Sequence, residues 1–143
     1  MPDNLHFLLM KSFHSCNKAI IKKTAELSLL PGQAKVLECL LECDGLTPKE
    51  IARRCSIDKS TITGLLKKME EKYLIDRIGD SDDRRAVQIM LTEEGKHYAE
   101  QAVLIGEKTD ALAASRLSTE QRESLMDLLR TVIATLEDEN SDP

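Results

Sequence analysis

The chain has 143 residues, of which 41% are hydrophobic and 31% charged, a composition typical of a folded domain and not of a disordered chain. No apolar run approaches the roughly 18 residues of a membrane span. The N-terminus shows no basic region followed by an apolar stretch, so we expect a cytoplasmic protein without a secretory signal. Aromatic residues are 3% and Trp is absent, so we expect a core of Leu, Ile, Val and Ala between packed helices.

The net charge of −5 would by itself argue against a nucleic-acid partner. The charge is, however, unevenly distributed. The segment Thr47–Leu91 contains 10 Lys and Arg residues against 8 Asp and Glu, a net of +2, while the rest of the chain carries −7. Because the basic charge is concentrated in one segment with acidic flanks, this segment is the candidate for nucleic-acid contact.

Two helices are predicted ahead of this segment. The first runs from Leu5 to about Leu29, because apolar residues recur at three- and four-residue steps. Pro31-Gly32 breaks the chain, and a second helix covers Gln33 to Cys43 before Asp44-Gly45 ends it. The apolar stripe of the first helix is Leu5, Leu8, Leu9, Phe13, Cys16 and Ile20, and that of the second is Val36, Leu37, Leu40 and Leu41.

A helix-turn-helix is predicted next. Thr47-Pro48-Lys49-Glu50 combines an N-cap Thr, Pro at the first helical position and Glu three residues after the cap, which is a strong helix start. This short helix ends near Arg54. Asp58 is expected to cap a following helix that runs from about Lys59 to Glu71. The buried stripe of that helix is Ile62, Leu65, Leu66 and Met69.

A β-hairpin and two helices complete the order. Leu74–Ile78 is predicted as a strand, residues 79–83 as a polar turn, and Ala86–Leu91 as a second strand with period-two alternation. A helix extends from Thr92 to about Ser115, and a capping box at residues 118–121 opens a last helix to about Leu136. Residues 137–143 form an acidic tail that we expect to be frayed. The apolar seams are Tyr98, Ala102, Ile105 and Leu112, then Leu125, Leu128, Leu129, Val132 and Leu136.

The face opposite the buried stripe of the Lys59–Glu71 helix suits the major groove of duplex DNA. Small or donor-bearing side chains near its start allow the backbone to approach the bases, and lysines one turn later match phosphates. The N–H groups of a helix start also suit phosphate oxygens. An ordinary solvated face of Lys and Thr explains the same pattern equally well. The residues concerned are Ser60, Thr61, Thr63, Gly64, Lys67 and Lys68.

The hairpin tip carries two adjacent arginines, Arg84 and Arg85, which folding does not require. Arginine on a narrow loop suits insertion into a minor groove, where the potential is most negative. The alternative is that they pair at the surface with Asp80, Asp82 or Asp83 and contribute little. Both can hold, because an acidic residue can orient an arginine before it meets DNA.

These residues resemble a known family. Asp83-Arg84-Arg85, the five residues Ala86 to Met90, and Leu91-Thr92 match the signature Asp-x-Arg, five residues, Leu-Thr of the MarR family of transcriptional regulators. The run from Asp58 to Leu66 is similar to the opening of that family's recognition helix. The element order of the whole chain is also similar, so the resemblance implies a mainly α fold with a small β-wing.

The resemblance implies a homodimer that binds a palindromic operator in double-stranded DNA as a repressor. Residues 1–30 would be an N-terminal dimerisation helix, 31–92 the winged helix-turn-helix, and 93–143 the C-terminal dimerisation helices and acidic tail, all in one intertwined domain. Arg85 would enter the minor groove, positioned by Asp83, and Arg53 and Arg77 are weaker phosphate candidates. Ser60, Thr61, Thr63 and Gly64 would face bases, and Lys59, Lys67 and Lys68 the backbone.

Members of this family commonly respond to small phenolic or aromatic ligands, or to oxidants through a cysteine. In the peroxide-sensing branch the reactive Cys precedes a Phe-Leu-Leu run, but here His6 precedes Phe7-Leu8-Leu9, and Met10 stands where a Tyr partner is expected. A different thiol route through Cys16 would require an exposed thiol with a lowered pKa. Our expectation for Cys16, Cys39, Cys43 and Cys55 is free, buried thiols that act as small apolar residues.

Two other classes of protein are considered. A winged helix that binds another protein should have an apolar or aromatic recognition face, which Ser60, Thr63, Gly64 and Lys67 do not provide. An enzyme is disfavoured, because the chain has no Gly-rich phosphate loop, no metal-ligand cluster and no nucleophile–base spacing. His6, His14 and His97 form no metal pattern, and we expect no cofactor.

Overall fold

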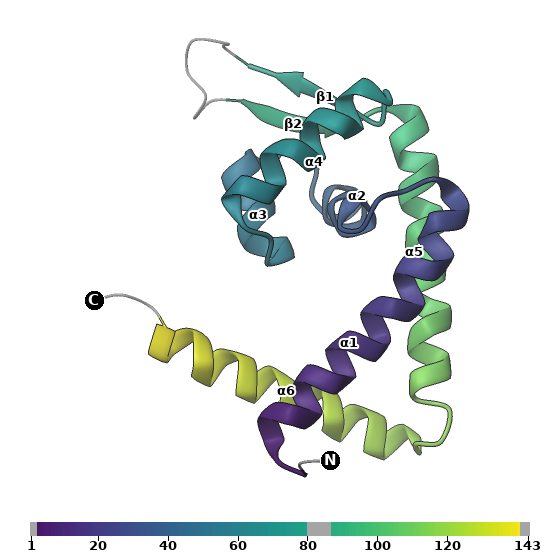
Figure 1. Ribbon diagram of the computed structural model, residues 1–143, viewed down its shortest axis with the longest axis vertical. Helices are drawn as coiled ribbons and strands as arrows, with labels where there is room; N and C mark the ends of the chain where they lie inside the picture. The colour runs from purple at the N-terminus through teal and green to yellow at the C-terminus, as the bar shows by residue number, and fades with distance from the viewer. Residues whose placement is uncertain (1–2, 80–86, 141–143) are drawn as a thin grey trace. The chain divides into compact units, whose positions relative to one another are not determined.

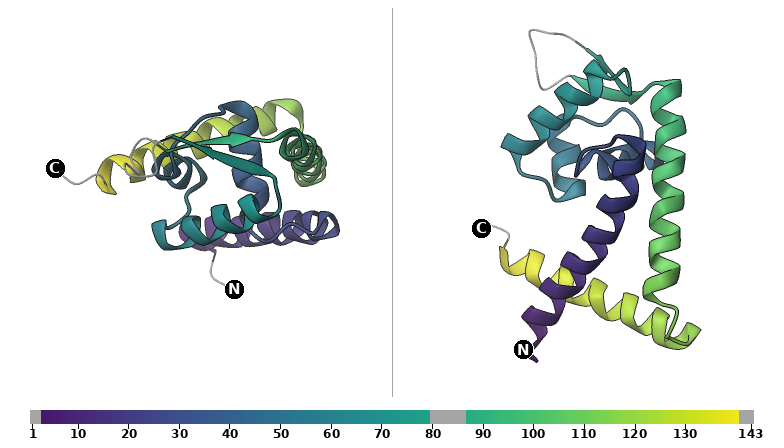
Figure 2. Two further views of the ribbon diagram at one scale, coloured as in Figure 1. Left: turned by 90° about the horizontal axis from the view of Figure 1, so that it is seen from above. Right: turned by 45° about the vertical axis from the view of Figure 1, so that its right-hand side comes forward.

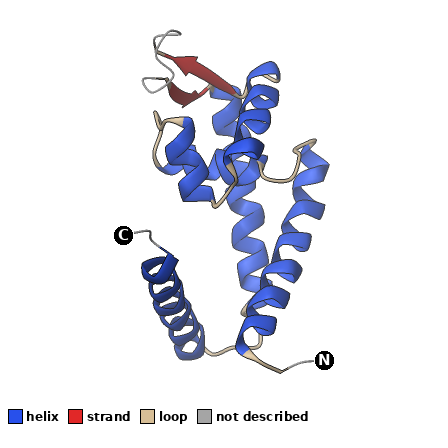
Figure 3. Ribbon diagram, turned by 60° about the vertical axis from the view of Figure 1, so that its left-hand side comes forward, coloured by secondary structure: helices blue, strands red, loops and turns tan. Residues whose placement is uncertain are grey.

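The structure, a computed structural model, describes residues 3–79 and 87–140. It is mostly helical with one small antiparallel hairpin (Figures 1 and 3), which confirms the predicted mainly α fold with a β-wing. None of the described helices is both long and apolar enough to cross a membrane. The elements are α1 (Leu5–Thr24), the 3₁₀ turn η1 (Ala25–Leu27), α2 (Gln33–Glu42), α3 (Pro48–Cys55), α4 (Lys59–Glu71), β1 (Ile75–Ile78), β2 (Gln88–Leu91), α5 (Glu93–Ala113) and α6 (Thr119–Asn140).

The chain divides into two compact units, Met1–Thr109 and Asp110–Pro143. Within the described residues, the buried apolar side chains all lie between Leu29 and Ala102, in the first unit. That core is built almost wholly of Leu, Ile, Val and Ala, as the composition predicted, with Met69 added. In α6, all of whose residues are described, none is buried.

The first helix ends earlier than predicted. Helix α1 stops at Thr24, passes through η1, and turns at Ser28, whose φ of 60° is left-handed. The Ser28 N–H donates to the Ala25 carbonyl at 2.9 Å, and the Leu29 N–H donates to the Thr24 carbonyl at 3.2 Å. This pair of bonds is a Schellman turn, which satisfies the last carbonyls of the helix. The turn directs Leu29 into the core, so the chain cannot stay helical as far as Leu29.

Both helices of the helix-turn-helix begin at the predicted N-cap residues, but only the first cap is made by a side-chain hydrogen bond. The Thr47 hydroxyl oxygen accepts a hydrogen bond from the Glu50 N–H at 3.2 Å, and α3 ends at Cys55. A second Schellman turn, centred on Ser56 with a φ of 54°, leads into α4. Asp58 occupies the N-cap position with extended backbone, but its side chain makes no capping hydrogen bond. The structure thus confirms Asp58 as the N-cap residue of α4, but without the side-chain hydrogen bond that such a residue usually accepts.

The strands of the hairpin are slightly shorter than predicted, and a residue from the α2–α3 loop pairs with the outer side of β2. Strands β1 and β2 pair from Ile75 with Leu91 to Ile78 with Gln88. On the other side of β2, Leu46 forms a bridge with Ile89, and their backbones are joined by Ile89 N–H to Leu46 oxygen at 2.8 Å. The loop between α2 and α3 therefore extends the small sheet.

The apolar seam of α5 agrees only in part with the predicted one. Ala102 is buried and Tyr98 packs against the core, as predicted, but Leu112 is 73% exposed. Gly95 and Ala99 are also buried. Gly95 permits the close approach, because a Cβ there would collide with the Leu74 carbonyl oxygen. The contact is between residues far apart in the sequence, so the periodicity of apolar residues in the helix does not predict it.

The last helix starts as predicted and continues further. The Gln121 N–H donates to the Ser118 hydroxyl oxygen at 3.1 Å, and the Ser118 N–H donates to the Gln121 side-chain oxygen at 2.9 Å. These reciprocal bonds confirm the capping box. Helix α6 continues past Leu136 to Asn140, so residues 137–140 are helical and not frayed, in keeping with the good helix propensity of Glu.

Candidate nucleic-acid interface

Helix α4 has one buried and one exposed face. The predicted stripe is buried at all four positions, Ile62, Leu65, Leu66 and Met69, and fixes the rotation of the helix about its axis. The structure brings the predicted contact residues of this helix together on solvent-exposed surface. These residues are Lys59, Ser60, Thr61, Thr63, Gly64, Lys67 and Lys68.

The exposed face is open at its centre. Apart from the chain neighbours and the backbone of α4 itself, no heavy atom of the described residues lies within 4 Å of the position that a Cβ on Gly64 would occupy, so another molecule can approach the backbone there. The Thr63 hydroxyl donates to the Lys59 carbonyl at 3.2 Å, which leaves its oxygen as an acceptor and its methyl group for apolar contact. Because the first N–H groups of a helix have no partner inside it, the start of α4 also presents donors.

The wing is joined to the end of α4 by an ion pair. The Arg77 Nε atom on β1 lies 3.4 Å from Glu70 Oε2 on α4. The hairpin follows α4 directly along the chain (Figure 2). Both side chains are more than a third exposed, so the pair adds little stability. It does occupy Arg77, which makes this residue a poorer phosphate contact than the sequence indicated.

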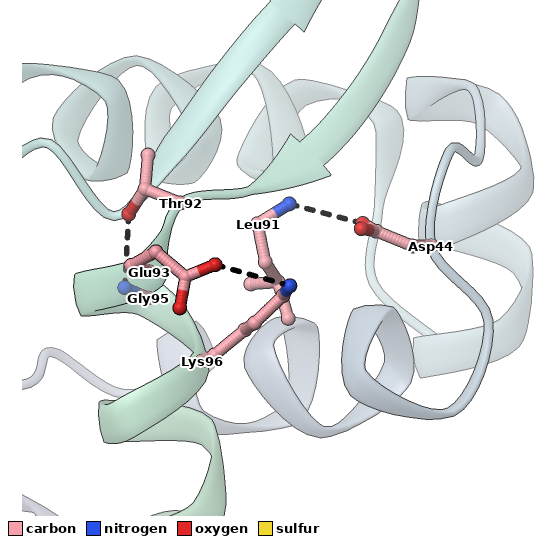
Figure 4. A network of polar contacts seen from close by, with 6 residues as sticks. All are labelled: Asp44, Leu91, Thr92, Glu93, Gly95 and Lys96. Carbon is pink, nitrogen blue, oxygen red and sulfur yellow. Dashed lines mark hydrogen bonds and ion pairs between the residues drawn. The ribbon is translucent and has the colours of Figure 1, made fainter.

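A second connection holds the base of the wing. The Asp44 carboxylate accepts a hydrogen bond from the Leu91 N–H at 2.9 Å (Figure 4). Next to it, the Thr92 hydroxyl donates to the Tyr73 carbonyl at 2.7 Å and accepts from the Gly95 N–H at 2.9 Å. These bonds join the α2–α3 loop, the end of β2 and the start of α5. From the sequence, Asp44 was expected only to end a helix, because no local pattern indicates its distant partner.

The remaining predicted site residues, Asp83, Arg84 and Arg85, lie outside the described residues, as do Asp80 and Asp82. Their assignment to the minor groove stays a prediction.

The thiols differ from the expectation of four buried cysteines. All four are free, but Cys16 is exposed, while Cys39, Cys43 and Cys55 are half-buried and pack against the core. Burial, together with Cys39, raises the pKa of Cys55 to about 12. Within residues 3–79 and 87–140, no group of three or more His, Cys, Asp or Glu side chains is placed to hold a metal ion.

Comparison with known proteins assigns the family. Residues 29–87 match the model of the MarR family. Over 140 residues the chain is 33% identical to the organic hydroperoxide resistance transcriptional regulator of Bacillus subtilis, and the match covers 98% of this chain and 94% of that protein. The chain belongs to the MarR family.

Other MarR-type proteins are similar over most of their length. The repressor MdtR of Bacillus subtilis is 29% identical over 126 residues, covering 88% of this chain and 79% of MdtR. The crystal structure of Staphylococcus aureus MepR in complex with DNA matches with a TM-score of 0.82 and 26% identity, covering 94% of this chain and 99% of that one. This MarR-family chain is a DNA-binding transcriptional regulator with a winged helix-turn-helix.

Proposed function

We propose that this MarR-family regulator acts in the cytoplasm as a homodimeric repressor, which binds a palindromic operator and is released by a small aromatic or phenolic ligand. The observation that carries the proposal is the exposed polar face of α4, with open space at Gly64 and a fully buried opposite stripe. A helix held rigidly from behind, with a small residue at its exposed centre, can enter a major groove.

The dimer is supported by apolar side chains left without cover in the single chain. Phe13 on α1 is 61% exposed and Leu128 on α6 is 65% exposed. Exposed apolar stripes of this kind mark association surfaces, and a two-fold dimer uses the same surface twice. We therefore assign residues 1–30 and 93–143 to dimerisation and 31–92 to DNA binding. Similarly exposed residues are Leu5, Leu8 and Met10 on α1, and Leu125, Met126, Ile133 and Leu136 on α6.

The contacts to DNA divide into three groups. Small and hydroxyl side chains at the start of α4 face bases, and the lysines neutralise phosphates. Arg85 enters the minor groove, where Asp83 orients it and Arg84 assists. In full, Ser60, Thr61, Thr63 and Gly64 are assigned to bases and Lys59, Lys67 and Lys68 to the backbone.

The effector is proposed only as a chemical class. The hydroperoxide response in the name of the Bacillus subtilis relative is not assigned to this chain, because His6 stands where the peroxide-sensing branch has its reactive cysteine. The polar centre of α4 also makes a winged helix that binds only other proteins the less favoured function.

Selection of bound fragments from genomic DNA by the purified full chain tests the proposal. Fluorescence anisotropy then measures affinity for the selected duplex over a range of salt concentrations. We expect Lys67→Ala to lower the slope of log K against log salt by about one, and Arg85→Ala to weaken binding without dissociating the dimer. Lys108→Ala, an exposed charge at the far end of α5, is the matched control. Enrichment of no duplex, or unchanged affinity in both test variants, would overturn the assignment.

A further inference from the structure

Two cysteines from different helices line one cavity. Cys39 lies on α2 and Cys55 is the last residue of α3, and both contribute to a cavity of about 600 Å³ that Val103 of α5 also lines. Leu41 gives the cavity an apolar patch. Its charged lining is balanced, with Lys35 and Arg54 against Glu38 and Glu42. All of these residues lie in the first compact unit, so the cavity is formed within it.

The two sulfurs lie close together. The Cys55 thiol donates to the Lys35 carbonyl oxygen, with Sγ 3.5 Å from that oxygen. Lys35 precedes Cys39 by one helical turn, and in a regular α-helix its carbonyl accepts the Cys39 N–H. The Cys55 sulfur therefore sits beside the backbone from which the Cys39 side chain projects, and the two side chains interact directly.

We propose that Cys39 and Cys55 form a dithiol site that binds monosubstituted trivalent arsenicals. In these compounds the arsenic atom carries one organic group and can bind two thiol sulfurs. An arsenoxide, R–As=O, condenses with both thiols. Two As–S bonds form, the As–O bond breaks, and the two thiol protons leave on the oxygen as water. Arsenic stays trivalent and neither sulfur is oxidised, so no oxidant is required.

The number of thiols in the site favours arsenicals over a metal ion as the ligand. Structural zinc requires four ligands, and within the part of the chain that the structure describes no cluster of three or more His, Cys, Asp or Glu side chains can hold a metal ion. Two thiols complete the coordination of an arsenic atom that already carries one organic group. Leu41 and Val103 offer that group an apolar wall.

The protonation state of the Cys55 thiol favours condensation with an arsenoxide over oxidation by a peroxide. Burial raises the pKa of this thiol to about 12, so it stays protonated at neutral pH and is a slow nucleophile toward peroxides, which react with thiolates. Condensation with an arsenoxide transfers both thiol protons to the departing oxygen. The reaction can therefore start from two protonated thiols, and its equilibrium does not depend on a thiolate already being present.

A competing pair lies at the end of α2. Cys43 is the C-cap residue of this helix, and its N–H donates to the Cys39 carbonyl at 3.0 Å. Cys43 packs against the core and is not among the side chains that line the cavity. The proposed site therefore uses Cys55, and this site stands independently of operator binding.

Intact-mass spectrometry of the native chain with one equivalent of phenylarsine oxide tests the site. We expect one phenylarsenic adduct that survives an excess of 2-mercaptoethanol and is removed by the dithiol 2,3-dimercaptopropanol. Cys39→Ala and Cys55→Ala should each weaken the adduct by at least about 100-fold, as expected on loss of a chelating second bond. Cys16→Ala and Cys43→Ala are the matched controls and should retain it.

Peptide mapping of the wild-type adduct identifies the bound cysteines without any substitution, so the test still works if a cysteine variant fails to fold. The expected product is a pair of peptides, one with Cys39 and one with Cys55, joined through arsenic. A bridge between Cys39 and Cys43, dependence on Cys16, or an adduct that the monothiol removes would overturn the proposal.

Discussion

The Asp44 carboxylate and the Leu91 backbone N–H form a hydrogen bond of 2.9 Å that ties the α2–α3 loop to the end of β2. The same loop pairs with the strand through Leu46 and Ile89. The wing is therefore anchored to the helix-turn-helix from both sides, by this bond and by the pair of Arg77 with Glu70.

Removing the Asp44 acceptor should loosen the wing. Asp44→Ala leaves the Leu91 N–H, which is part-buried, without its partner, and we expect the free energy of unfolding to fall by about 1–2 kcal/mol in urea denaturation. Asp44→Asn keeps an acceptor oxygen and should recover most of that loss. Equal destabilisation in both variants would show that the hydrogen bond is not the cause.

Substitution of Gly64 should change stability and DNA affinity in opposite directions. Alanine meets open space at this position and improves helix propensity, so thermal denaturation should show a gain of about 0.5–1 kcal/mol. The added methyl group holds the backbone of α4 away from the base edges, so anisotropy should show weaker binding to the selected operator. A more stable protein with unchanged affinity would place this face outside the interface.

Substitution of Gly95 should destabilise the fold. A Cβ there collides with the Leu74 carbonyl oxygen, and a backbone atom cannot move aside as a side chain can, so we expect Gly95→Ala to cost about 1–3 kcal/mol. Gly106 in the same helix is the matched control, because its Cβ would meet only a side-chain oxygen of Glu38 at 3.2 Å. If the two variants are equally stable in urea, the close approach of α5 to Leu74 is not needed.

Cys55 should make the protein less stable at alkaline pH. Its pKa is 9.0 as an ordinary thiol and about 12 in the fold, so below pH 9.0 both states are protonated, and above it the unfolded chain loses a proton that the folded chain keeps. The free energy of unfolding should therefore fall as pH rises from about 9 toward 12. Cys55→Ala should show a shallower fall than the wild type, and Cys16→Ala, an exposed thiol, should follow the wild type.

Features that depend on neighbouring residues were predicted well from the sequence. The buried stripe of α4 is a matter of helical period, and the Thr47 cap and the Ser118–Gln121 box are formed by residues three apart. The grouping of the candidate α4 residues on exposed surface follows from the same period. Their contact with DNA and the roles of Asp83, Arg84 and Arg85 remain predictions.

Features that depend on distant partners were missed. The collision that requires glycine at position 95 involves the Leu74 carbonyl, and the wing anchor at Asp44 involves Leu91. Neither pair is close in sequence. The early end of α1 has the same origin, because Lys72 donates to the Ser28 carbonyl at 2.9 Å and Leu29 is drawn into the core.

The two ends of α4 share one backbone feature. Ser56 before the helix and Tyr73 after it both have left-handed φ values, 54° and 60°, at positions where glycine is usual. A residue with a Cβ reaches far fewer backbone conformations than glycine. Both joints are therefore stiffer than glycine would make them, which disfavours a tilt of α4 relative to α3 and β1. We expect that release of the proposed operator requires α3, α4, β1 and β2 to move together as one rigid body.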